Sequence, residues 1–168
     1  MSVSGFVKGT WLRKLHVVER PAETYLLAGA SRPIFNINDG PAWIVALFGL
    51  ANGNLDNVAG GATLEFTVNG VAVDGAATAV AGSAAGDIVV CPLDTTAVGV
   101  VLAANACECV PDLTALALGA GQMIATSSVA GAAPGLINLV VGIANFTATL
   151  TMYVAYYRMS PAASVTVA

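Results

Sequence analysis

The chain has 168 residues, of which 57% are hydrophobic and only 10% are Asp, Glu, Lys or Arg. An ordinary soluble domain carries about 25% charged residues. One domain of this length has too little interior to bury so much apolar surface. An oligomer interface, a larger assembly or a membrane must therefore cover the excess, and we favour a protein assembly.

The charges are unevenly distributed along the chain. Five of the six cations lie in the first 32 residues beside two carboxylates, so this segment has a net charge of +3 and the remainder a net charge of −7. A basic segment on an acidic body suits docking onto an acidic protein surface, where ion pairs set the approach and the register. Nucleic-acid binding is disfavoured, because the cations are few and the acidic body opposes phosphate.

The start of the chain and its cysteines indicate where the protein is made. The first fourteen residues, MSVSGFVKGTWLRK, lack the long apolar segment and the cleavage site of a secretory signal, so we expect synthesis in the cytoplasm. Cys91, Cys107 and Cys109 are an odd number and cannot form a fully paired disulfide framework. We expect reduced, buried thiols.

In chain order, the first predicted strands are Thr10–Val18, Thr24–Ala28 and Pro33–Ile37. The turns around Gly40 and Gly53 bracket Ala42–Ala51, which predicts a buried strand.

The next predicted element is a hairpin. Residues 63–68 alternate in character before Asn69-Gly70, and an apolar run follows, which is the strongest short-range hairpin signal. The low-complexity segment Gly75–Gly86 is expected to be a mobile loop or a weakly specified strand. The later predicted strands are Asp87–Cys91, Val98–Ala103, Met123–Val129, Leu136–Ala144 and Thr149–Val154.

Many short strands separated by turns predict an all-β, single-domain β-sandwich or jelly roll. One short helix at Pro111–Leu118 is the only helix we expect, with Asp112 as its N-cap and Gly119 after its end. Residues 1–32 form a basic arm or the first strands, and residues 33–168 form the sandwich body. A membrane-spanning helix at Gly135–Tyr157 is disfavoured, because Asn and Thr residues interrupt the run.

The residues that carry most enzyme chemistry are scarce. His16 is the only histidine, which removes most acid–base and metal-site designs. Cys107-Glu108-Cys109 resembles half of a metal site, but a closed zinc site needs four ligands and Cys91 and His16 would have to complete it. We therefore predict no catalytic, cofactor-binding or metal-binding residues, and no enzyme activity.

Two stretches point to a family. The first is PIFNI at 33–37 with GPAWIVALFG at 40–49, and the second runs from Met123 through a Pro134-Gly135 turn to a last strand ending in Tyr157-Arg158. Both resemble small all-β virion proteins of tailed bacteriophages, over about residues 33 to 158. The resemblance implies a structural subunit of the particle, located in the virion. Its expected role is that of a decoration (cement) protein that binds the major capsid protein and stabilises the head.

Decoration proteins of this kind are often trimers, so the resemblance also implies a homotrimer. A tail, neck or fibre-base protein of the virion is the alternative, because the body is richer in Ala and poorer in charge than an exposed capsid ornament. A β-barrel membrane protein is a further alternative, although the strands are short and no signal peptide is evident. We expect binding to virion proteins and not to nucleic acid or a membrane.

The basic segment supplies the predicted docking residues: Lys8, Trp11, Arg13, Lys14 and Arg20. A Trp among flexible cations is a common interface anchor, because Trp and Arg concentrate binding energy. Two other interpretations stay open, namely that Trp11 fills the core of the domain and that the cations are a solvated terminal strand.

Overall fold

The computed structural model describes residues 14–25, 31–55, 63–80, 83–91, 93–98, 100–102, 123–126, 134–142 and 148–168. Within these ranges all regular structure is β-strand, so the predicted all-β fold is confirmed. None of the described residues belongs to a helix long and apolar enough to cross a membrane.

The strands form two large sheets and a small one. Sheet A contains β1 (Leu15–Tyr25), β13 (Ala148–Arg158), β3 (Pro41–Ala51), β8 (Ile88–Cys91) and β10 (Val100–Leu102) in that order, with β11 (Met123–Thr126) also paired to β3. Sheet B contains β14 (Ser164–Val167), β2 (Ser31–Asn38), β12 (Gly135–Val141), β4 (Thr63–Val68) and β5 (Val71–Ala72), with β7 (Thr78–Ala79) also paired to β4. The third sheet is a parallel pair, β6 (Asp74–Ala76) and β9 (Asp94–Val98).

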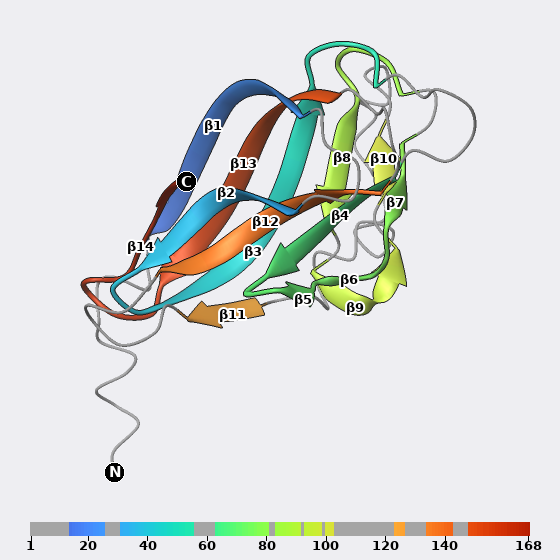
Figure 1. Cartoon of the computed structure of the whole chain (residues 1–168). Helices are drawn as coiled ribbons and strands as arrows, with labels where there is room; N and C mark the ends of the chain where they lie inside the picture. The colour runs from blue at the N-terminus through green and yellow to red at the C-terminus, as the bar shows by residue number, and fades with distance from the viewer. Residues whose placement is uncertain are drawn as a thin grey trace.

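The order of these strands is that of a jelly roll. Successive long strands alternate between the sheets, and early strands pair with late ones: β1 and β3 pair with β13, while β2 and β4 pair with β12. This double Greek-key wrapping closes the domain as a sandwich. Figure 1 shows the two sheets as facing layers, with β1 and β14 along one side.

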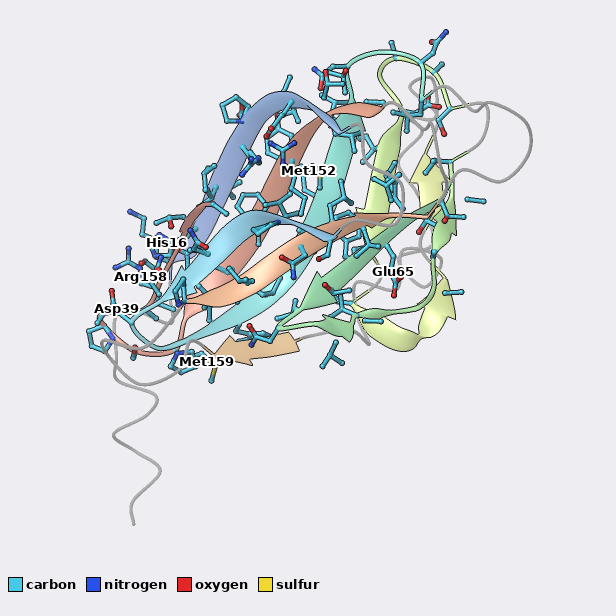
Figure 2. All side chains as sticks on the ribbon, viewed as in Figure 1. His16, Asp39, Glu65, Met152, Arg158 and Met159 are labelled. Carbon is cyan, nitrogen blue, oxygen red and sulfur yellow. The ribbon has the colours of Figure 1, made fainter. Side chains whose placement is uncertain are left out.

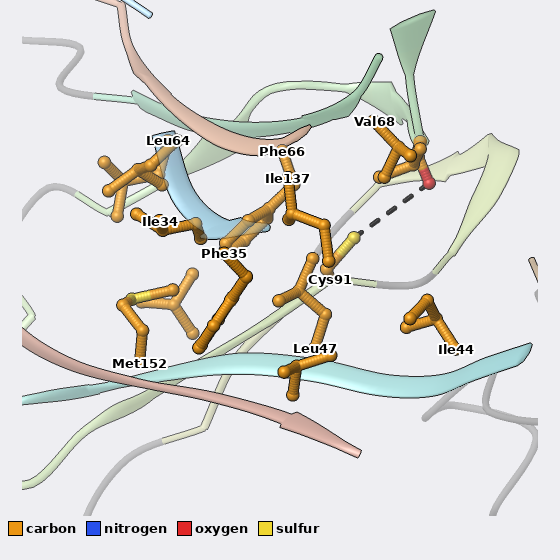
Figure 3. Packing of buried hydrophobic residues seen from close by; sticks show 14 of the residues in the cluster. Ile34, Phe35, Ile44, Leu47, Leu64, Phe66, Val68, Cys91, Ile137 and Met152 are labelled. Atoms are coloured by element: carbon orange, nitrogen blue, oxygen red, sulfur yellow. Dashed lines mark hydrogen bonds between the residues drawn. The ribbon is translucent and has the colours of Figure 1, made fainter. Parts of the chain in front are cut away.

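Residues from both sheets fill one core between the layers. Phe35 and Phe66 from sheet B and Ile44 and Leu47 from sheet A are fully buried, and Figure 3 shows Phe35, Phe66 and Leu47 pointing into the same space, with Ile44 to one side. Along β3 the burial alternates, because successive side chains of a strand point to opposite sides. Cys91 is buried in this core, as expected for it. Cys107 and Cys109 lie outside the described residues.

The predicted hairpin at Asn69-Gly70 is confirmed. Both residues have positive φ, 53° and 80°, and Val68 pairs with Val71 across the turn. These φ values suit the two-residue turn that the twist of a hairpin favours, and Asn and Gly are the residues that adopt them most easily.

The first strand differs from the prediction of two separate strands at Thr10–Val18 and Thr24–Ala28. From Leu15 to Tyr25 the chain forms one strand that continues through Pro21. Between Arg20 and Glu23 the register against β13 shifts by one residue, which is a β-bulge. Proline is tolerated here because β1 is an edge strand, where one side of the backbone needs no ladder partner.

Other sequence expectations have mixed outcomes. The segment Gly75–Gly86 holds the end of β6 and all of β7, and β9 and β14 are strands that the sequence did not predict. The expected helix at Pro111–Leu118 lies outside the described residues.

Candidate docking surface

The two sheets present very different outer surfaces. On sheet B the outward positions are mostly polar, and two hydrogen bonds link neighbouring strands: Asn38 Nδ2 donates to Thr166 Oγ1 at 3.0 Å, and Asn138 Nδ2 to Thr67 Oγ1 at 3.3 Å. The first pair is exposed and the second is buried, so the polar side chains of sheet B are partly in contact with water and partly satisfied by each other.

On sheet A the outward positions are apolar and aromatic. Residues opposite each other in an antiparallel pair point to the same side of the sheet, so the pairing register identifies this surface. We call it the sheet A face and define it by Leu15 and Val17 of β1, Tyr153, Ala155 and Tyr157 of β13, Trp43, Ala46, Phe48 and Leu50 of β3, and Ile88 and Val90 of β8. Among the described outward positions of these four strands, Glu19 is the only Asp, Glu, Lys or Arg.

Two aromatic pairs lie on β13 and β3, the two inner strands of the sheet A face. The rings of Phe48 and Tyr153 are stacked, with centroids 5.0 Å apart, and those of Trp43 and Tyr157 are tilted with centroids 5.8 Å apart. All four side chains are half-buried in the chain by itself. Trp and Tyr are enriched in protein interfaces because they offer large contact area at low entropic cost, so these pairs are candidate anchors.

The sheet A face continues to the outermost strand of the sheet. Leu15 is 46% exposed and Val17 is 61% exposed, and both lie on β1. β1 pairs with β13 on one side, and in the described part of the chain no strand pairs with its other side. Apolar side chains on an open edge are an association site unless something protects them.

The second half of β1 is protected by its own residues. Arg20 donates from Nε and Nη2 to Glu23 Oε2, at 3.1 and 2.5 Å, and Arg32 donates to Glu23 Oε1. Pro21 and the bulge beside it further prevent another strand from pairing here. The first half of the strand, residues 15–18, has no ion pair, proline or bulge, and β14 lies beside β1 without pairing with it.

The inner side of this first half carries a cluster of cations. The ring of His16 stacks on Tyr156 at 5.3 Å, and burial, followed by the positive charges of Arg158 and Lys14, lowers the pKa of His16 below its ordinary value of 6.5. Arg158 Nε is buried without a hydrogen-bond partner. Figure 2 shows His16 and Arg158 close to each other.

The predicted docking residues are distributed differently from the expectation of one basic arm. Lys14 is exposed at the start of β1, beside His16. Arg20 is buried, and its Nη1 donates to the main-chain oxygens of Ile34 and Ala168 at 3.1 and 2.7 Å. The guanidinium of Arg20 therefore links the edge of sheet A to sheet B, so we assign Arg20 a stabilising role inside the domain and not a docking role. Lys8, Trp11 and Arg13 lie outside the described residues.

The aromatic pairs are the part of this surface that the sequence analysis did not identify. A signal was present, because Tyr153, Ala155 and Tyr157 alternate with residues that are now seen to be buried. Their pairing with Trp43 and Phe48 depends on the register between β13 and β3.

In the described ranges, no three His, Cys, Asp or Glu residues lie close enough together to hold a metal ion. Comparison with protein-family models, with curated proteins and with solved structures finds no match for this chain.

Proposed function

We propose that the chain is a structural subunit of a tailed-phage particle, and that it acts by packing against other protein chains and not by catalysis. The observation that carries the proposal is the contrast between the sheets: the outer side of sheet B carries mostly amides and hydroxyls, whereas the outer side of sheet A is apolar and aromatic. Monomeric proteins rarely leave so large an apolar surface in water.

The particle is the part of the proposal that rests on the resemblance of residues 33–158 to small phage virion proteins. Jelly rolls occur in viral capsids, and also in lectins and cupins, so the fold is compatible with this role without deciding it. The leading role is that of a trimeric decoration protein that binds the major capsid protein and stabilises the head. The second candidate is a tail, neck or fibre-base subunit, because a low charge suits a surface covered on several sides.

Mass spectrometry of gradient-purified particles tests the proposal. We expect this chain in the particles in a fixed ratio to the major capsid protein. Particles made without the chain should assemble but release their genome at a lower temperature than wild-type particles. Recovery of the chain only from the soluble fraction would overturn the proposal, and recovery with separated tails would favour the second candidate.

A further inference from the structure

We propose that the part of the sheet A face formed by β13, β3 and β8 of one copy receives the first half of β1, residues 15–18, from a second copy of the same chain. The inference deepens the proposed structural role by naming the partner and the contact. The inference rests on the proposed structural role, but the experiment that tests it measures only self-association of the purified chain.

The size of the sheet A face suits a protein interface. Strands about 4.8 Å apart and about 30 Å long give roughly 500 Å² in projection for β1, β13, β3 and the shorter β8, and side-chain relief raises the accessible area above this value. A standard interface buries about 800 Å² of accessible surface on each partner. The face therefore has room for one neighbouring domain edge.

Charge favours a second copy as the occupant. The whole chain has a net charge of −4, so two copies repel each other unless they meet where charge is absent. The sheet A face offers such a place, since Glu19 is the only Asp, Glu, Lys or Arg at its described outward positions. Residues 15–18 are also uncharged, apart from any protonation of His16, whose lowered pKa keeps it largely neutral at pH 7.

The position of the exposed apolar side chains of sheet A indicates an edge-to-face contact. Val17 and Leu15 project from the outermost strand, whereas the aromatic pairs lie on the two inner strands, β13 and β3. A face-to-face contact would leave the unprotected half of the β1 edge open to further pairing. An edge-to-face contact covers the first half of the β1 edge and the aromatic pairs in each copy. Such a head-to-tail contact closes into a ring when the rotation between copies allows it.

Lysine substitutions at the two halves of the contact test the inference. Val17→Lys changes the edge and leaves the part of the sheet A face on β13, β3 and β8 intact, while Ala46→Lys places a charge on that part and leaves the edge intact. Each has a matched control on sheet B: Val71→Lys, at a position 66% exposed, and Ala79→Lys, at an exposed position of β7. Circular dichroism and thermal unfolding show whether each variant folds.

Light scattering and native mass spectrometry at micromolar concentration provide the readout. We expect wild type and both control variants to be oligomers of one size, and V17K and A46K each to be monomers. Mixing V17K with A46K leaves one intact contact, between the face of V17K and the edge of A46K, so a 1:1 heterodimer should form. Its formation also shows that both variants are folded.

Each alternative contact gives a different result, and each result overturns the inference. Self-association of V17K at wild-type size indicates a face-to-face contact, and self-association of A46K indicates an edge-to-edge contact. A monomeric wild type means that another protein or another segment of this chain covers the face. The proposed structural role would survive that last result if the chain is still found in purified particles.

Discussion

Arg20 donates a hydrogen bond of 2.7 Å from Nη1 to the main-chain oxygen of Ala168, 148 residues further along the chain. The same nitrogen donates to the oxygen of Ile34 at 3.1 Å, which also accepts a hydrogen bond from the main-chain nitrogen of Ala168 at 3.2 Å. One guanidinium therefore joins the edge strand of sheet A to two strands of sheet B. The planar fork of Arg can serve several acceptors at once, which an ammonium cannot do in the same geometry.

Replacing Arg20 with Met should lower the free energy of unfolding by about 2–4 kcal/mol, because it removes the donors from a buried ionic network while keeping the apolar stem. Arg20→Lys should recover only part of this loss. Lys14→Met, at an exposed position, should change stability by less than about 0.5 kcal/mol. Chemical unfolding at one fixed protein concentration measures all three, and a stable R20M variant would contradict the assigned role.

Gly40 lies in the turn between β2 and β3 with φ at +135°, and a Cβ added there would lie 2.5 Å from Ser160 Oγ. Gly40→Ala should therefore destabilise the domain by about 1–3 kcal/mol through backbone strain and the contact with Ser160. Gly53 is the matched control, because a Cβ there would meet nothing within 4 Å and its φ is not in the positive range. Thermal unfolding compares the two variants, and equal effects would show that the turn at Gly40 adapts.

Tyr156 is buried and its hydroxyl accepts a hydrogen bond of 3.1 Å from the main-chain nitrogen of Val165, so it connects β13 to β14. Tyr156→Phe leaves that buried donor without its acceptor, and we expect a loss of about 1–3 kcal/mol. Amide hydrogen exchange should accelerate in β14 before it does in β3. Unchanged exchange at Val165 would show that the hydroxyl does not hold this strand.

The strands that the sequence predicted best are those with their own local signals. Asn69-Gly70 marks a turn because both residues adopt positive φ at little cost, and the alternating run before it predicts β4. β14 alternates polar and apolar residues but has only four of them, a pattern too short to predict a strand without its pairing to β2. The strand through Pro21 was missed because proline normally ends a strand, and only the position of β1 at the edge permits it.

The sequence predicted that the domain has an apolar docking surface, but it did not predict which residues form that surface. Composition required a covered apolar surface, and the basic segment suggested that the surface lay there. The fold instead places Arg20 in an internal network and brings Phe48 beside Tyr153 from strands about 100 residues apart in sequence. Contacts of this kind depend on register, which single-sequence periodicity does not contain.

His16 should make folding weaker as the solution is acidified. Its pKa in the folded chain is lowered by burial and by the charges of Arg158 and Lys14, so the unfolded chain binds a proton first as the pH falls below about 6.5. Protonation of His16 then stabilises the unfolded state, while the folded state is still unprotonated and is not stabilised. Stability is therefore lost from about pH 6.5 downward, until the folded ring is protonated as well.

An NMR titration of the single histidine measures this directly, and the expected pKa lies below 6.5. Arg158→Met removes one nearby positive charge and should raise the pKa of His16 toward its ordinary value. His16→Gln should reduce the loss of stability between pH 7.5 and pH 5, because the titrating group is gone while the carboxylates are unchanged. A His16 pKa above 6.5 would mean that a carboxylate, and not Arg158 and Lys14, determines the charge at this end of β1.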